Sequence, residues 1–155
     1  MDLNISYKIV ELSQMSEADQ ALVKSAEASL MYVHAPYSKF SVGSAVRDVS
    51  GKVTTGSNQE NAAYPSGLCA ERVAVFAAKS QSKVDLDTIV VLAKNEKGQL
   101  ADAFSCGNCR QVMMEYASVQ KGPIKIIMQR KEGDFVMLDD VRFLLPFSFA
   151  SDSLK

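Results

Sequence analysis

Two short stretches, Cys69-Ala70-Glu71-Arg72 and Cys106-Gly107-Asn108-Cys109, contain all three cysteines of this 155-residue chain. Each stretch opens a segment with the apolar spacing of a helix, over residues 68–79 and 106–119. The positive end of a helix dipole lowers the pKa of a thiol and favours the thiolate form. Two such helix N-termini directed at one point would hold three thiolates around a single cation.

Three thiolates favour a soft cation with tetrahedral coordination, for which zinc is the first choice. A structural zinc site usually has four protein ligands, but this chain has no fourth cysteine and a single histidine, His34. We interpret His34, which stands before Ala35-Pro36, as a loop or packing residue. Three protein ligands and one open position are typical of a catalytic site, in which the metal lowers the pKa of a bound water. The sequence therefore predicts one catalytic Zn²⁺ per chain.

Charged residues flank the predicted metal ligands. Glu71 lies in the first helical turn, two residues after Cys69, where it can exchange a proton with water at the metal without being a ligand. The alternative is that Glu71 only complements the helix dipole, and its position alone does not separate the two roles. Three thiolates on one dication leave a net charge of about −1, which Arg72 or Arg110 could offset.

The rest of the chain alternates helical and strand patterns around these two helices. Ser16 caps an earlier helix, which ends before Pro36 because the residue preceding a proline avoids helical geometry. Strands are expected over residues 40–49, 52–57, 87–94, 124–129 and 134–138, with a short helical turn at 140–145. This order predicts an α/β layered domain around a mixed sheet of about five strands.

Length and composition are those of one globular domain, and we expect residues 1–155 to form it. Within it, residues 1–12 form a strand or arm and residues 151–155 a frayed tail.

The 17 basic and 18 acidic side chains give a net charge of −1, so a polynucleotide-binding surface is not indicated. No apolar run approaches the ~18–20 residues of a membrane span. Clustered thiols without an export signal are typical of the reducing cytoplasm.

Several motifs together resemble those of the small, homotetrameric, three-cysteine cytidine deaminases of the cytidine and deoxycytidylate deaminase superfamily. Beside the two cysteine stretches, the matching segments are Tyr37-Ser38-Lys39-Phe40-Ser41-Val42-Gly43, Asn58-Gln59-Glu60-Asn61-Ala62-Ala63-Tyr64-Pro65, and Leu144-Leu145-Pro146 with Phe149. The joint match is specific, whereas a lone Cys-x-x-Cys would not be.

The resemblance implies a three-layer αβα cytidine-deaminase-like fold and hydrolysis of cytidine and 2'-deoxycytidine to uridine and 2'-deoxyuridine. Zinc on Cys69, Cys106 and Cys109 would activate water for attack at C4 of cytosine, with Glu71 carrying protons. Arg72 would offset the thiolate charge. The implied substrate-binding residues are Phe40 against the base, Asn58 and Glu60 on the ribose, Asn61, Ala62, Tyr64, the Ala70 backbone, and Phe149 from a neighbouring subunit of a homo-oligomer, expected to be a tetramer.

One residue departs from the family's usual pattern. Ser105 stands where these deaminases commonly have a proline before the second cysteine. A serine at this place can cap the helix that follows. We therefore expect the metal site to survive the change.

Four other functions are weighed against this one. The first is deamination of another cytosine-containing nucleoside. The second is a non-catalytic zinc-binding module, against which Glu71 and the missing fourth ligand argue. The third is thiol-redox chemistry at Cys106 and Cys109, which leaves Cys69 unexplained. The fourth is editing of RNA or DNA, which the near-neutral charge disfavours.

Overall fold

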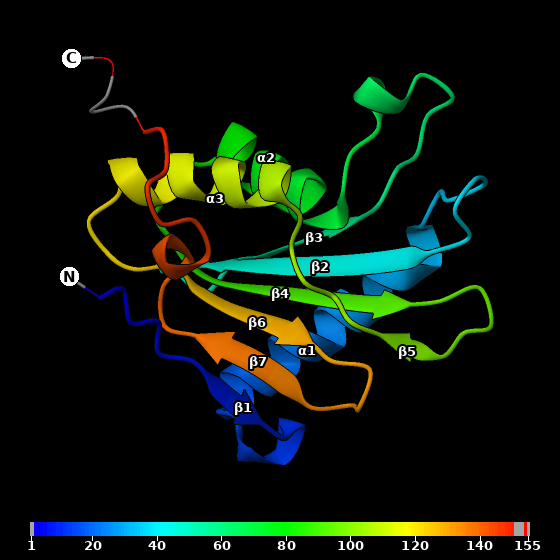
Figure 1. The fold of residues 1–155 in the computed structure, drawn as a ribbon, viewed down its shortest axis with the longest axis horizontal. Coiled ribbons are helices and arrows are strands. Elements are labelled where there is room, and N and C mark those ends of the chain that lie inside the picture. The colour runs from blue at the N-terminus through cyan, green and yellow to red at the C-terminus, as the bar shows by residue number, and fades with distance from the viewer. Residues whose placement is uncertain (1, 151–153, 155) are drawn as a thin grey trace.

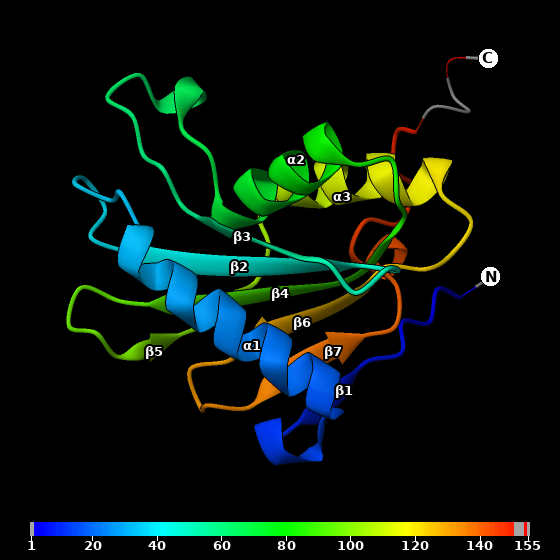
Figure 2. The same cartoon turned by 180° about the vertical axis from the view of Figure 1, so that it is seen from behind.

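A mixed β-sheet separates two helical layers, as the ribbon of the computed structural model shows (Figure 1). The structure describes residues 2–150 and residue 154. One face of the sheet carries α1 (Glu17–Ser29), which lies in front of it in Figure 2. The opposite face carries α2 (Ala70–Gln81) and α3 (Gly107–Val119). The expected three-layer αβα arrangement is confirmed.

The sheet of the described residues has seven strands in the order β1-β7-β6-β4-β2-β3, with β5 paired to the end of β4. β4 and β6 run parallel and are joined through α3, whereas the other pairings are antiparallel. The strands are β1 (Lys8–Val10), β2 (Ser41–Asp48), β3 (Val53–Ser57), β4 (Leu86–Lys94), β5 (Leu100–Ala101), β6 (Lys125–Gln129) and β7 (Phe135–Leu138).

The expected number of about five strands is too small for two reasons. β5 is two residues long and pairs where the turn after β4 returns, so no alternation of side chains marks it in the sequence. β1 lies within residues 1–12, for which a strand or arm was expected. Its place in the main sheet depends on pairing with β7 in the register Lys8↔Met137, a long-range contact that no local pattern reveals. The expected frayed tail at 151–155 lies outside the described residues, apart from Leu154.

The apolar core has two parts, one on each face of the sheet. Leu22 of α1 packs with Val90 of β4, whereas Val75 of α2 and Met113 of α3 pack with Ile89 of the same strand. Successive side chains of a strand point to opposite faces, so the central strand β4 serves both layers. Among the described residues, no helix has the length and apolar character that crossing a membrane requires.

A buried ion cluster fastens α1 to the sheet. The two carboxylate oxygens of Asp19 accept hydrogen bonds from Arg47 of β2 at 3.0 Å and from Lys125 of β6 at 2.6 Å. Arg47 also donates to Asp87 at the start of β4. Burial raises the pKa of Asp19, but the hydrogen bonds and charge of Lys125, assisted by Arg47, outweigh it and hold the pKa below its usual value.

We predict that Asp19→Asn lowers the free energy of unfolding at pH 7 by about 3 kcal/mol, because one partner of a buried ion pair is lost. The folded-state pKa of Asp19 lies below the unfolded value of about 3.9. The stabilisation is therefore fully present above that value and is lost as pH falls through the folded-state pKa. Urea unfolding at pH 7 and at pH 3 should show the difference between wild type and variant shrinking in acid.

The matched control is Asp139→Asn, which breaks an ion pair with Lys8 whose two side chains are both exposed. Exposed pairs contribute little to stability, so this variant should unfold like wild type. Equal losses in the two variants would contradict the role assigned to Asp19.

Candidate active site

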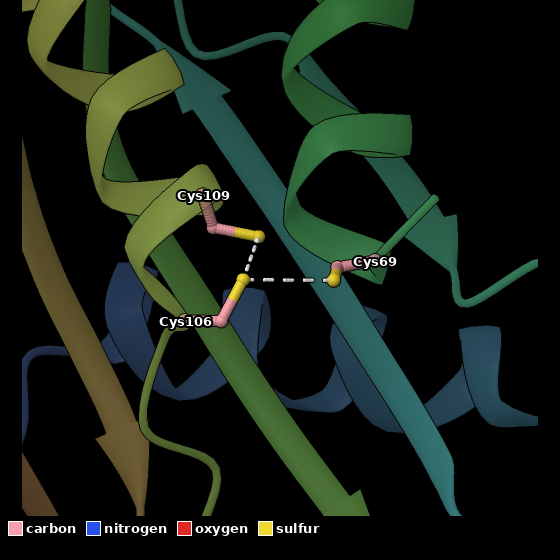
Figure 3. Close-up of side chains that lie close together, drawn as sticks. All are labelled: Cys69, Cys106 and Cys109. Carbon is pink, nitrogen blue, oxygen red and sulfur yellow. Dashed lines mark hydrogen bonds between the residues drawn. The ribbon is translucent and has the colours of Figure 1, made fainter. Parts of the chain in front are cut away.

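Three thiols from two helices meet at one point of the α2–α3 layer (Figure 3). Cys69 is the N-cap residue of α2, Cys106 is the N-cap residue of α3, and Cys109 lies in the first turn of α3. The sulfurs of Cys69 and Cys106 are 3.8 Å apart, and those of Cys106 and Cys109 are 3.5 Å apart. The structure thus brings together all three expected metal ligands.

The sulfur triangle has the dimensions of a zinc site. Ligands about 2.3 Å from a tetrahedral zinc ion lie about 3.8 Å from one another, and the three sulfurs all lie within 4.8 Å of one another. Among the described residues, no further histidine, cysteine or carboxylate joins this group. The donor set therefore fits one zinc ion whose fourth position stays open to a small ligand.

The three thiols strongly affect one another's ionisation. Interaction with the Cys109 thiol lowers the pKa of Cys69 to about 5, against the effect of burial and with a contribution from Arg72. The same interaction, together with burial and the charge of Glu71, raises the pKa of Cys109. Neighbouring thiolates repel one another, so a cation between them is needed for all three to ionise.

Arg72, one turn along α2, is directed at this cluster. Its Nη2 atom lies 3.8 Å from the Cys69 sulfur and 3.3 Å from the Gly67 carbonyl oxygen. Burial opposes its charge, but interaction with Cys69 keeps the pKa of Arg72 raised. Arg110 instead donates to the carbonyl oxygen of Ser105 at 2.8 Å. Of the two arginines considered for charge balance, Arg72 is the one that contacts a predicted ligand.

Glu71 is buried beside the cluster, with 3% of its surface exposed. Burial raises the pKa of its carboxyl group, and the charge of Cys69 adds to this effect, whereas the Ser105 hydroxyl opposes it. The carboxyl group lies outside the set of mutually close metal-ligating atoms. A buried carboxyl with a raised pKa, next to an open metal position, is suited to accept and release a proton.

A cavity of about 750 Å³ adjoins Cys69 and Arg72. Its volume lies within the usual range of about 300–1,000 Å³ for small-molecule sites. Its walls come from residues 37–42, residues 58–68 and the start of α2. Of the expected substrate-binding residues, those that line it are Phe40, Asn58, Glu60, Asn61 and Tyr64.

Asn58 and Glu60 are tied to the backbone of the opposite wall. The Asn58 side chain accepts a hydrogen bond from the Val42 amide and donates one to the Phe40 carbonyl, both at 2.9 Å. One carboxylate oxygen of Glu60 accepts from the amides of residues 37 and 38, at 2.9 and 3.2 Å. Carboxamide and carboxylate groups retain further hydrogen-bonding capacity beyond these contacts, so both side chains can also bind a ligand.

Three expected substrate-binding residues do not line the cavity of the single chain. Ala70 is fully buried at the start of α2. Ala62 is exposed in the segment 58–67, which stands out from the body of the protein (Figure 1). Phe149 lies beside α3, where its carbonyl oxygen accepts a hydrogen bond from Gln111 at 2.7 Å and its side chain stays exposed.

Sequence reasoning did not single out part of the cavity wall. These further lining residues are Tyr37, Ser38, Val42, Gln59, Gly67 and Leu68. Tyr37 packs edge-to-face against Tyr64, with ring centroids 6.0 Å apart. Five of the six lie next to an expected residue or ligand in the chain, or are separated from one by a single residue, and Tyr37 lies three positions before Phe40. That the two loops face each other is a tertiary contact, which local sequence does not show.

Ser105 does not cap α3, contrary to the expectation. α3 begins at Gly107 and its N-cap residue is Cys106, so Ser105 lies one residue too early for its hydroxyl to take the capping position. Its hydroxyl is buried and has no hydrogen-bond partner among the described residues.

Residues 16–123, which hold the three thiols, Glu71 and both cavity loops, match a family model described as the cytidine and deoxycytidylate deaminase zinc-binding region. The chain belongs to this deaminase family. The resemblance noted in the sequence is thereby confirmed.

Similar proteins span nearly the same length as this chain. A cytidine deaminase of Halalkalibacterium halodurans is 35% identical over 136 residues, which is 88% of this chain and 97% of that protein. A cytidine deaminase of Sporosarcina psychrophila is 32% identical, covering 88% and 94% of the two chains. The crystal structure of cytidine deaminase from Burkholderia pseudomallei is 34% identical, with a TM-score of 0.74 over 87% of this chain and 100% of that one.

We predict that Arg72→Gln weakens zinc retention by roughly tenfold or more, which is typical when a residue supporting a metal ligand is lost. Arg110→Gln should have a smaller effect, because Arg110 donates to carbonyl oxygens rather than to a sulfur. Zinc remaining on the protein in competition with a chelator measures both. A larger loss in Arg110→Gln would transfer the charge-balancing role to that residue.

Proposed function

We propose that this protein is a zinc-dependent hydrolase that converts cytidine and 2'-deoxycytidine to uridine and 2'-deoxyuridine, releasing ammonia. The observation that carries the proposal is the three-thiol cluster with an open fourth position beside the buried carboxyl of Glu71. Family membership and the cavity next to Cys69 support the same reaction. The reaction suits a salvage role for free nucleosides, and the three free thiols suit the cytoplasm.

The residues of this chain divide the chemical work as follows. When bound by the three thiolates, zinc supplies an activated water nucleophile. Glu71 accepts the proton that this water gives up and delivers it to N3 of the cytosine as C4 is attacked. Glu71 then takes the proton of the hydroxyl group now on C4 and passes it to the amino group. The C4–O bond becomes the carbonyl of uridine, the C4–N bond breaks, and ammonia leaves. The raised pKa of Glu71 suits a group that both accepts and donates.

The cavity wall provides the means to hold a nucleoside. Phe40 supplies an aromatic face for the pyrimidine, and the Ala70 backbone contacts its edge. Asn58 and Glu60 bind the ribose hydroxyls with the hydrogen-bonding capacity that their backbone contacts leave free. Asn61, Ala62 and Tyr64 complete the loop beside the substrate. Support comes from the fixed positions of Asn58 and Glu60 at the wall.

We further propose that the active enzyme is a homotetramer in which Phe149 of one chain covers the base bound by another. Phe149 is held by its backbone on α3, yet its side chain is 61% exposed. Tyr64, at the cavity, is 75% exposed. The C-terminal segment that holds Phe149 (residues 145–150) and the loop 58–67 lie at opposite ends of the molecule in both views (Figures 1 and 2). A neighbouring chain is therefore needed to bring them together.

Glu71→Gln tests the proposed chemistry. It preserves size but removes the proton-accepting carboxylate, a contribution of about 10²–10⁴-fold in general acid–base catalysis. We expect at least a thousandfold loss of cytidine turnover with one zinc per chain retained. The matched control Glu115→Gln, at an exposed site on α3, should keep full activity. Uridine and ammonia formation, with and without a chelator, give the readout, and turnover of Glu71→Gln within tenfold of wild type would refute the role.

Phe149→Ala tests the shared site. Removing a stacking face from a base costs about 1–3 kcal/mol, so KM for cytidine should rise about fivefold to a hundredfold. Phe147→Ala, which truncates another exposed phenylalanine of the same segment, should change KM much less.

Co-expression of Phe149→Ala with Glu71→Gln should form hybrid oligomers, in which an intact Glu71 of one chain meets an intact Phe149 of another. If isolated hybrids are no more active at low cytidine than both parents combined, the shared site is wrong.

A further inference from the structure

Ser38 lines the cavity next to two expected substrate-binding residues, although no role was expected for it. Its Oγ atom accepts a hydrogen bond from the Phe40 amide at 3.0 Å. Its own amide donates a hydrogen bond to Oε2 of Glu60 at 3.2 Å. Ser38 is therefore fastened both to the residue expected at the base and to a residue expected at the ribose.

The backbone around Ser38 fixes the place of its hydroxyl at the cavity wall. Lys39, the next residue, has a φ angle of 56°, a left-handed conformation that few residues other than glycine adopt. The Lys39 amide donates to the Ala35 carbonyl oxygen at 3.1 Å. Such a conformation persists only where surrounding contacts hold it, and it is common at functional sites. The turn over residues 35–40 thus presents the Ser38 hydroxyl at a defined position.

The Ser38 hydroxyl and the Glu60 carboxylate are complementary hydrogen-bonding groups on one part of this wall. Within residues 2–150, the amides of Tyr37 and Ser38 both donate to Oε2 of the carboxylate. The Ser38 hydroxyl lowers the pKa of Glu60, and the two amides add to this effect, so the group is ionised at neutral pH. An ionised carboxylate only accepts hydrogen bonds, whereas a serine hydroxyl can also donate one. The wall therefore offers a ligand an acceptor and a donor together.

We propose that Ser38 is a specificity-determining residue, whose hydroxyl donates a hydrogen bond to the same pentose hydroxyl from which Glu60 accepts one. A pentose hydroxyl is both donor and acceptor, so it can satisfy the two side chains at once. The Phe40 amide occupies one lone pair of the Ser38 oxygen and leaves its proton for the substrate. The proposal rests on the proposed function, in which cytidine and 2'-deoxycytidine are both substrates. The recognised hydroxyl is then one that both substrates carry, at C3' or C5'.

The test compares kcat/KM of zinc-loaded wild type and Ser38→Ala for cytidine, 3'-deoxycytidine and 5'-deoxycytidine. Wild type should use one of the two analogues at least about tenfold less well than cytidine, because the missing hydroxyl leaves polar groups of the wall unpaired. Ser38→Ala should reduce this preference by about threefold to tenfold, the typical effect of one lost hydrogen bond. Its activity on 2'-deoxycytidine relative to cytidine should stay as in wild type, because the recognised hydroxyl is present in both.

The ratio between substrates separates a contact with the pentose from a purely structural role. Loss of the bond to the Phe40 amide alone would lower kcat/KM for cytidine and for both analogues by the same factor. Ser38→Thr keeps the hydroxyl and should keep the wild-type preference. If Ser38→Ala does not fold, Ser38→Cys gives the same comparison, because a thiol is a weak donor. The matched control Ser25→Ala removes a hydroxyl that bonds locally to the Ala21 carbonyl oxygen on α1, and it should leave every ratio unchanged.

The outcomes for Ser38 and for the proposed function are distinguishable. If wild type deaminates cytidine but shows no preference for it over either analogue, the role of Ser38 is wrong and the proposed function stands. The same conclusion follows if Ser38→Ala keeps the wild-type preference, or if Ser38→Thr loses as much of it as Ser38→Ala does. If zinc-loaded wild type releases no ammonia from cytidine, the proposed function itself fails, and the role of Ser38 fails with it.

Discussion

The close packing of α2 on β3 at Gly56 is the contact on which the site depends. A Cβ atom at Gly56 would lie 2.5 Å from the Ala74 amide nitrogen and 2.6 Å from the Ala70 carbonyl oxygen. Both are backbone atoms of α2, so any larger residue would push the whole helix away from the sheet. Ala70 directly follows Cys69, and a displaced helix would carry the Cys69 sulfur with it. Sulfurs 3.5–3.8 Å apart match zinc, and a shift of even one ångström would break that match. The absence of one side chain in β3 thus fixes the metal-binding geometry.

Electrostatics then explains why helix N-termini form this site. Three thiolates on a dication carry a charge of about −1, and each helix N-terminus contributes about +0.5. Two termini therefore offset roughly the excess charge before any side chain does. Arg72, 3.8 Å from the Cys69 sulfur, adds a full positive charge on one side only. Glu71 is buried beside these charges, and its pKa is raised. Its carboxyl group therefore binds a proton more readily than an exposed carboxyl group does. The pattern favours proton exchange at Glu71 and metal retention at the thiols.

Local sequence patterns predicted the helices, the main strands and the thiol cluster, because these depend on periodicity and on residues a few positions apart. The Cys69–Glu71 spacing predicted that the two residues lie together at the start of a helix, and the structure has Cys69 as the N-cap residue of α2 and Glu71 in its first turn. Features that depend on distant contacts were missed. β5 is too short to show alternation, and the contacts of Glu60 with residues 37 and 38 depend on how two loops face each other. The prediction that Ser105 caps α3 was wrong by one residue, because the sequence does not define the first residue of a helix that closely.

The single chain leaves its cavity only partly walled, and its exposed aromatic rings suggest how the wall is completed. Tyr64 and Phe149 are 75% and 61% exposed. Fully burying one such side chain contributes about 1.5–3 kcal/mol, and a single chain obtains little of this. Assembly that covers these rings would gain that free energy at the same surface that encloses the substrate. Because the loop 58–67 and the C-terminal segment lie at opposite ends of one chain, a chain cannot close its own site with them. In the proposed assembly, the free energy that holds the subunits together therefore also removes water from the cavity in which Glu71 would transfer its proton.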